Sequence, residues 1–140
     1  MTARTLTRSS PLLLVLFGVL FPFQWLGDHW AGFGAMLAAL VPGDRAHTLA
    51  HASLFFKLGL VAVNTFPRLG RRPLLFAAVV VAAAISQEAF QLLYKDALLT
   101  FDTYRDMAAD LAGGAAALGA LWAMQQAGLS CPVKRRLWGE

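Results

Sequence analysis

The chain has 140 residues, of which 58% are hydrophobic and only 14% charged, with a mean hydropathy of +0.57. A soluble domain usually carries about 25% charged residues, and a soluble fold this small has too little core to bury so much apolar surface. The composition therefore excludes an ordinary cytosolic enzyme, a disordered chain and a nucleic-acid-binding domain, and it favours the lipid bilayer as solvent. The net charge of +4 fits a membrane protein, because cytoplasmic loops are enriched in Lys and Arg.

Four apolar segments have about the 20 residues that a helix needs to cross a bilayer. We expect these helices over residues 11–27, 46–66, 73–94 and 106–126. The first resembles a signal peptide, but it lacks a clear small-x-small cleavage site and Pro22 interrupts its end, so we interpret it as a retained helix. The predicted fold is an all-α integral membrane protein, a single domain over residues 1–140 built as a bundle of four transmembrane helices.

The segment between the first two predicted helices, residues 28–44, is too short to cross the bilayer and too apolar for an open loop. One interpretation is an interfacial or re-entrant piece at the outer surface, with Trp25 and Trp30 anchored among the lipid headgroups. The other is a continuation of the first helix as a long, tilted and kinked element. Pro42 and Gly43 then predict a turn, and Asp44 is the expected cap of the second helix.

The basic residues are distributed unevenly between the two sides of the predicted bundle. Eight lie before the first helix, between the second and third, or after the fourth: Arg4, Arg8, Arg68, Arg71, Arg72, Lys134, Arg135 and Arg136. Only Arg45, Lys95 and Arg105 lie in connections on the other side. The positive-inside rule therefore predicts that both termini are cytoplasmic, with residues 127–140 forming a basic cytoplasmic tail.

Small residues recur every four positions along the fourth predicted helix. One stripe contains Ala109, Gly113 and Ala117, and a second contains Ala108, Ala112, Ala116 and Ala120. Small residues let helices approach closely in lipid, where hydrophobicity does not drive helices together. A stripe of this kind can serve a dimer or the interior of the bundle, and we favour the interior.

Ionisable residues inside apolar helices indicate a functional site, because they are costly unless they face the bundle interior or water. Three helices each carry such residues three or four positions apart, hence on one face. The pairs are His47 and His51, Glu88 and Gln91, and Asp106 and Asp110. At 1.5 Å per residue, one member of each pair lies roughly 6–9 Å below the outer helix end. We therefore expect the pairs to meet at one depth.

The expected cluster allows more than one kind of chemistry. His51 beside Glu88 and Asp110 can act in general acid–base catalysis. The same nitrogen and oxygen atoms can bind a divalent metal, or they can simply tie the helices together. Because no HExxH motif is present, we favour acid–base chemistry, assign no metal ligands and name no cofactor.

From about residue 44 to residue 119, the chain resembles the VanZ-like family of small bacterial membrane proteins. The segment GDRAHTLAHASLFF is similar to the family's acidic–basic pair, His and aromatic residue, the segment ISQEAFQ to its Glu-x-x-Gln, and RDMAADLAGGAAALG to its Asp and Gly block. The matching residues are Asp44, Arg45, His51, Phe55, Glu88, Gln91, Asp106, Asp110, Gly113 and Gly114. Asp110 stands where the family usually has Asn, and Arg105 or Lys95 is the candidate for its Arg before the last helix.

The resemblance implies a bacterial inner-membrane protein that binds or modifies an envelope lipid or a lipid-linked intermediate, in the context of glycopeptide resistance. His51, Glu88 and Asp110 would be its reactive residues, and a polar network of His47, Gln91, Asp106 and Arg105 would support them. The alternative is a non-catalytic accessory subunit of a larger membrane complex, in which the polar residues only lock the bundle. A transporter is less favoured, because no inverted repeat is visible.

Overall fold

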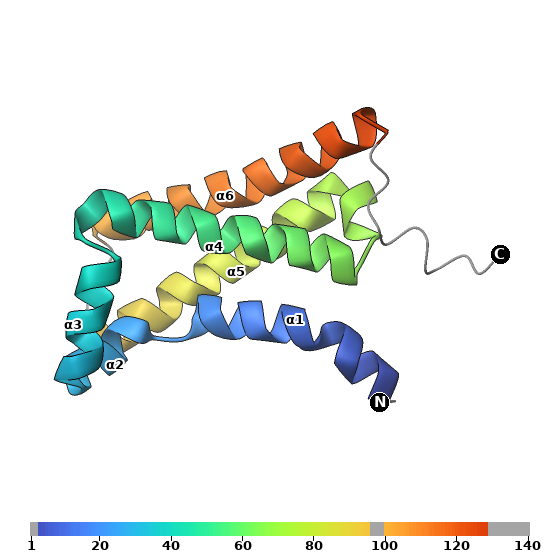
Figure 1. Ribbon diagram of the computed structural model, residues 1–140. Helices are drawn as coiled ribbons and strands as arrows, with labels where there is room; N and C mark the ends of the chain where they lie inside the picture. Colours follow the sequence, from blue (N-terminus) through green and yellow to red (C-terminus); the bar gives the residue numbers. More distant parts are fainter. Residues whose placement is uncertain (1–2, 96–99, 129–140) are drawn as a thin grey trace.

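The computed structural model describes residues 3–95 and 100–128, and throughout this part the regular structure is helical (Figure 1). The helices are α1 (Ala3–Leu20), α2 (Phe23–His29), α3 (Ala31–Leu40), α4 (Gly43–Thr65), the short 3-10 helix η1 (Leu69–Arg71), α5 (Pro73–Lys95) and α6 (Phe101–Gln126). Most of the predicted basic tail, residues 129–140, lies outside the described residues.

By length and composition, the described part of the chain has three helices that can cross a membrane, namely α4, α5 and α6. A fourth crossing is available if residues 10–20 of α1 and the whole of α2 are counted as one span, since the two are bent by 57° at the break between them. Pro22 lies at this break, where it lacks a backbone N–H and disfavours helical geometry in the residue before it. The prediction of an all-helical fold, with helices long and apolar enough to span a membrane, is confirmed for the described residues.

Two helices begin earlier than predicted. Helix α4 begins at Gly43, whose φ of 75° is readily adopted only without a side chain, so the turn after Pro42 passes directly into the helix. The prediction that Asp44 caps this helix is wrong, because Pro42 holds the cap position and Asp44 lies in the first turn. Helix α6 begins at Phe101 rather than at residue 106, with Thr100 at its cap and Asp102 in a first turn that favours negative charge.

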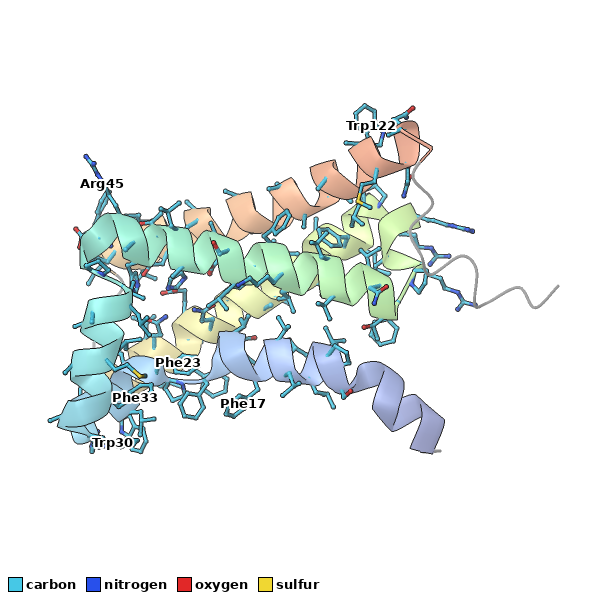
Figure 2. All side chains as sticks on the ribbon, in the orientation of Figure 1. Phe17, Phe23, Trp30, Phe33, Arg45 and Trp122 are labelled. Carbon is cyan, nitrogen blue, oxygen red and sulfur yellow. The ribbon has the colours of Figure 1, made fainter. Side chains whose placement is uncertain are left out.

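The segment predicted as interfacial, re-entrant or a continuation of the first helix is itself helical but interrupted. Trp30 separates α2 from α3 in an extended conformation, and α3, at ten residues, is too short to cross a bilayer. Figure 1 shows α3 running crosswise to α4. Aromatic contacts stabilise the corner between α2 and α3 (Figure 2). The ring centroids of Phe23 and Phe33 are 6.4 Å apart, and those of Phe33 and Trp30 are 6.1 Å apart.

The interior is built around α4, which packs most extensively against α6 and also against α1. Phe55 and Leu58 of α4 are almost completely buried, together with Phe76 of α5. The α6 stripe of Ala109, Gly113 and Ala117 is buried, whereas the stripe that begins at Ala108 faces outward. The expected role of the first stripe in internal packing is confirmed.

The two ends of the molecule carry different elements. The start of α1, the α4–α5 connection with η1, and the end of α6 lie at one end (Figure 1). The α2–α3 corner and the starts of α4 and α6 lie at the other end. Side chains that project inward from the early turns of α4 and α6 therefore meet near the second end.

Candidate functional site

The ionisable members of the polar pairs predicted from the sequence lie in three different helices and converge. His51 is eight residues into α4, and Asp110 is nine residues into α6, which places them ~12 and ~14 Å along their helices. Glu88 is seven residues before the end of α5, or ~10 Å from it. One ligand atom of each of these three residues lies within 4.8 Å of the others. The expected meeting is confirmed, somewhat deeper than predicted because α4 and α6 begin earlier.

The closest contact in the cluster joins α4 to α6. Nδ1 of His51 lies 2.9 Å from Oδ1 of Asp110, and the two side chains are 6% and 0% exposed. A hydrogen bond to an ionised partner is stronger than a neutral one, and its strength rises where water is excluded. The second carboxylate oxygen of Asp110 is also buried, and no described residue donates a hydrogen bond to it.

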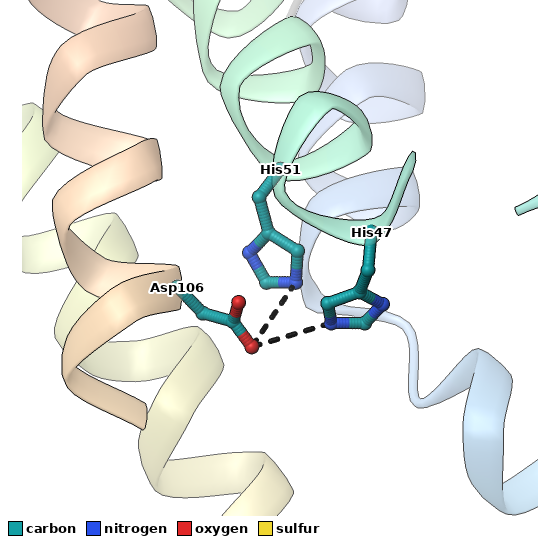
Figure 3. Close-up of side chains that lie close together, drawn as sticks. All are labelled: His47, His51 and Asp106. Carbon is teal, nitrogen blue, oxygen red and sulfur yellow. Dashed lines mark hydrogen bonds and ion pairs between the residues drawn. The ribbon is translucent and has the colours of Figure 1, made fainter. Parts of the chain in front are cut away.

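A second set of contacts lies one turn nearer the helix ends. Nε2 of His47 is 3.2 Å from Oδ2 of Asp106, and Nε2 of His51 is 3.9 Å from the same oxygen (Figure 3). The two imidazole rings have centroids 4.7 Å apart, as expected for residues four apart on one helix. The His47 side chain is 43% exposed, whereas that of Asp106 is 7% exposed, so His47 lies at the open edge of the cluster.

Arg105 borders the cluster with a group of acidic side chains. Its guanidinium nitrogens lie 3.3 Å from Asp44 and 3.3 Å from Asp102, and its Nε lies 3.8 Å from Oδ1 of Asp106. The sequence pattern predicted Arg105 as part of the polar network, but Asp102 was not predicted as its partner. Their spacing of three could have predicted the pair, because residues three apart share a face once the helix is known to begin at Phe101.

Helix α5 contributes a further polar residue that was not predicted from the sequence. Gln91, which was predicted, is half-buried, and Glu88 is 4% exposed. Gln87 is 8% exposed, and its Oε1 accepts no hydrogen bond from the residues that the structure describes. Gln87 precedes Gln91 by four positions and therefore shares its face, which is the signal that identifies it.

The cluster as a whole is rich in oxygen acceptors. It contains three buried carboxylates and two imidazoles, and the only permanently charged cation in direct contact with it among the described side chains is Arg105. Buried charges must be paired, protonated or bound to a cation. Such an arrangement can transfer protons or hold a cation.

No protein-family model matches the chain, and no curated protein or solved structure matches it significantly. The resemblance to the VanZ-like family therefore stays a prediction that rests on the motif residues.

Proposed function

We propose that this chain is a VanZ-like protein of the bacterial inner membrane that binds or modifies an envelope lipid or a lipid-linked intermediate. In this proposal four spans form a bundle, both termini are cytoplasmic, and the polar cluster lies near the outer leaflet. The observation that carries the proposal is the burial of His51, Glu88 and Asp110 from three helices within 4.8 Å of one another. Buried ionisable residues within a membrane-spanning bundle mark functional sites.

The orientation in the proposal follows from the distribution of basic residues. Arg68, Arg71 and Arg72 lie at the same end of the molecule as the start of α1, and the cluster lies toward the opposite end (Figure 1). Under the positive-inside rule the first end is cytoplasmic. The open edge at His47 then faces the outer leaflet, where envelope lipids are processed.

In the proposed chemistry, Glu88 or His51 handles the proton and Asp110 orients His51. A carboxylate that accepts a hydrogen bond from one imidazole nitrogen fixes the tautomer and the direction of the other nitrogen. Such a pair can accept a proton near neutral pH, which is useful for opening or forming a bond at a lipid headgroup.

The test is complementation of a strain that lacks the protein. Glu88→Gln keeps the size of the side chain and removes its charge, so we expect susceptibility to a glycopeptide such as teicoplanin to match that of the deletion strain. Asp102→Asn is the matched control, since this carboxylate is 71% exposed and outside the buried cluster, and we expect it to behave as wild type. Protein levels in the membrane are checked by immunoblot. A Glu88→Gln strain that protects as well as wild type contradicts the proposal.

Native mass spectrometry of the gently extracted protein separates the proposal from the accessory-subunit alternative. A monomer or dimer that carries a specific lipid supports the envelope role. A larger assembly of fixed composition supports the alternative, in which the cluster only locks the helices.

A further inference from the structure

We infer that His47, His51 and Asp106 form a binding site for a divalent transition metal of the zinc class. This inference does not depend on the proposed function, because the site can be occupied whatever the protein does with a lipid. The sequence favoured acid–base chemistry because no HExxH motif is present. The geometry of the three side chains is a separate observation that sequence alone did not provide.

The donor atoms lie close to the separations that a tetrahedral metal requires. Two ligands ~2.1 Å from one zinc ion, at tetrahedral angles, lie ~3.4 Å apart. Oδ2 of Asp106 is 3.2 Å from Nε2 of His47 and 3.9 Å from Nε2 of His51, which brackets that value. The three residues each offer one ligand atom, and these atoms lie within 4.8 Å of one another (Figure 3). Binding requires that Nε2 of His51 move ~0.5 Å closer to Oδ2 of Asp106 than its present 3.9 Å.

The surroundings of His51 select this trio over the second one, His51, Glu88 and Asp110. An ionised carboxylate only accepts hydrogen bonds, so with Asp110 ionised the 2.9 Å contact has the hydrogen on Nδ1 of His51. The lone pair is then on Nε2, which points toward Asp106 and His47. Metal-bound histidines commonly donate their other N–H to a carboxylate in this way. Asp110 therefore positions the His51 ring so that its Nε2 can bind the metal.

Two further observations point to a cation at this place. Oδ1 of Asp106 is buried and accepts no hydrogen bond from any described residue, and its ion-pair contact with Nε of Arg105 is long, at 3.8 Å. The His47 side chain is 43% exposed, which gives an ion a route from the surface. Two imidazoles with one carboxylate leave a fourth position open to water or another ligand. When a metal occupies Nε2 of His51, Glu88 is the group left to handle protons.

The test is zinc stoichiometry in the full-length protein, purified in detergent with a Strep-tag, because a polyhistidine tag would itself bind zinc. After equilibration with micromolar zinc and removal of free ion, we expect one zinc per chain by plasma mass spectrometry. His47→Ala and Asp106→Asn should each lose the bound zinc. His29→Ala is the matched control, since this third histidine is exposed on α2 and outside the cluster, and it should retain one zinc. Asp110→Asn should weaken zinc binding about 10–100-fold.

A cobalt(II) spectrum of the wild-type protein provides a readout that does not depend on folding of the variants. Intense visible absorption bands that zinc abolishes support a tetrahedral site. If the wild-type protein binds no more zinc per chain than the His47→Ala variant, the inference is overturned. Zinc that is retained in His47→Ala but lost in Glu88→Gln assigns the metal to the second trio and overturns it as well.

Discussion

Replacing Gly113 with alanine tests the closest contact between α4 and α6. A Cβ atom at Gly113 would overlap the carbonyl oxygen of Ala52, with the carbonyl carbon at 2.8 Å and the Cα at 3.0 Å. All three are backbone atoms, so no side-chain rotation can relieve the overlap. Relief requires that the two helices separate, and we expect Gly113→Ala to destabilise the protein.

The magnitude follows from the separation that is needed. Carbon atoms pack best at about 3.5–4.0 Å, so the helices must part by roughly 1 Å at this point. Asp110 and His51 lie next to the contact, and the same movement lengthens their 2.9 Å hydrogen bond to about 3.9 Å, beyond the usual limit. Overpacking typically costs about 1–3 kcal/mol, and a hydrogen bond between membrane helices contributes about 0.6–1.7 kcal/mol. The expected loss in the free energy of unfolding is therefore about 2–5 kcal/mol.

The assay is SDS-induced unfolding in mixed micelles, followed by circular dichroism. Gly119 lies on the same helix, and a Cβ atom there would have no neighbouring atom within 4 Å, so Gly119→Ala should not destabilise the protein and can raise its stability by up to about 1 kcal/mol through helix propensity. Gly114→Ala should fall between the two, because its Cβ would meet a methyl group of Val80 at 2.6 Å rather than backbone. If Gly113→Ala is as stable as Gly119→Ala, the close α4–α6 packing at Ala52 is incorrect.

Two further predictions concern the ion pairs at the edge of the cluster and the orientation of the chain. Arg105→Ala should lower the free energy of unfolding by less than about 1 kcal/mol. Its two closest partners, Asp44 and Asp102, are 86% and 71% exposed, and its contact with the buried Asp106 is 3.8 Å, longer than a hydrogen bond. A loss above about 1 kcal/mol in the same SDS assay would contradict this and show that the Asp106 contact stabilises the fold. Green fluorescent protein fused after Glu140 should fluoresce and alkaline phosphatase there should be inactive, whereas phosphatase inserted after Pro42 should be active; the reverse pattern contradicts cytoplasmic termini.

The helical fold was predictable because its signal is spread over many residues. Each of α4, α5 and α6 has an apolar stretch about as long as the bilayer is thick, and such a stretch satisfies its backbone hydrogen bonds only as a helix. The helix starts were less predictable, because they depend on single residues. Phe101 begins α6 in a polar segment without apolar periodicity, and Gly43 begins α4 through a positive φ that composition does not reveal.

The residues of the cluster were predictable, but their pairing was not. Spacing of three or four places His47 and His51 on one face, and similar depths bring Glu88 and Asp110 toward them. Which nitrogen meets which oxygen depends on the rotation of each helix about its axis, and a periodic pattern does not fix that rotation to within a hydrogen-bond length. Asp102 was not predicted because it lay outside the predicted helix. Gln87 was not predicted because the prediction for this part of the helix rested only on the charged Glu88 beside it and on Gln91.

The small residues of α6 and the polar cluster depend on one another. Asp110 comes three residues before Gly113, and His51 comes directly before Ala52, whose carbonyl group lies where a Gly113 side chain would be. The glycine therefore sets the helix separation at which the His51–Asp110 hydrogen bond can form. A larger residue at position 113 would remove that bond without changing either partner, so the cluster is held in place by a residue that takes no part in its chemistry. Loss of bound zinc in Gly113→Ala, with all three proposed ligands intact, would be the direct sign of this dependence.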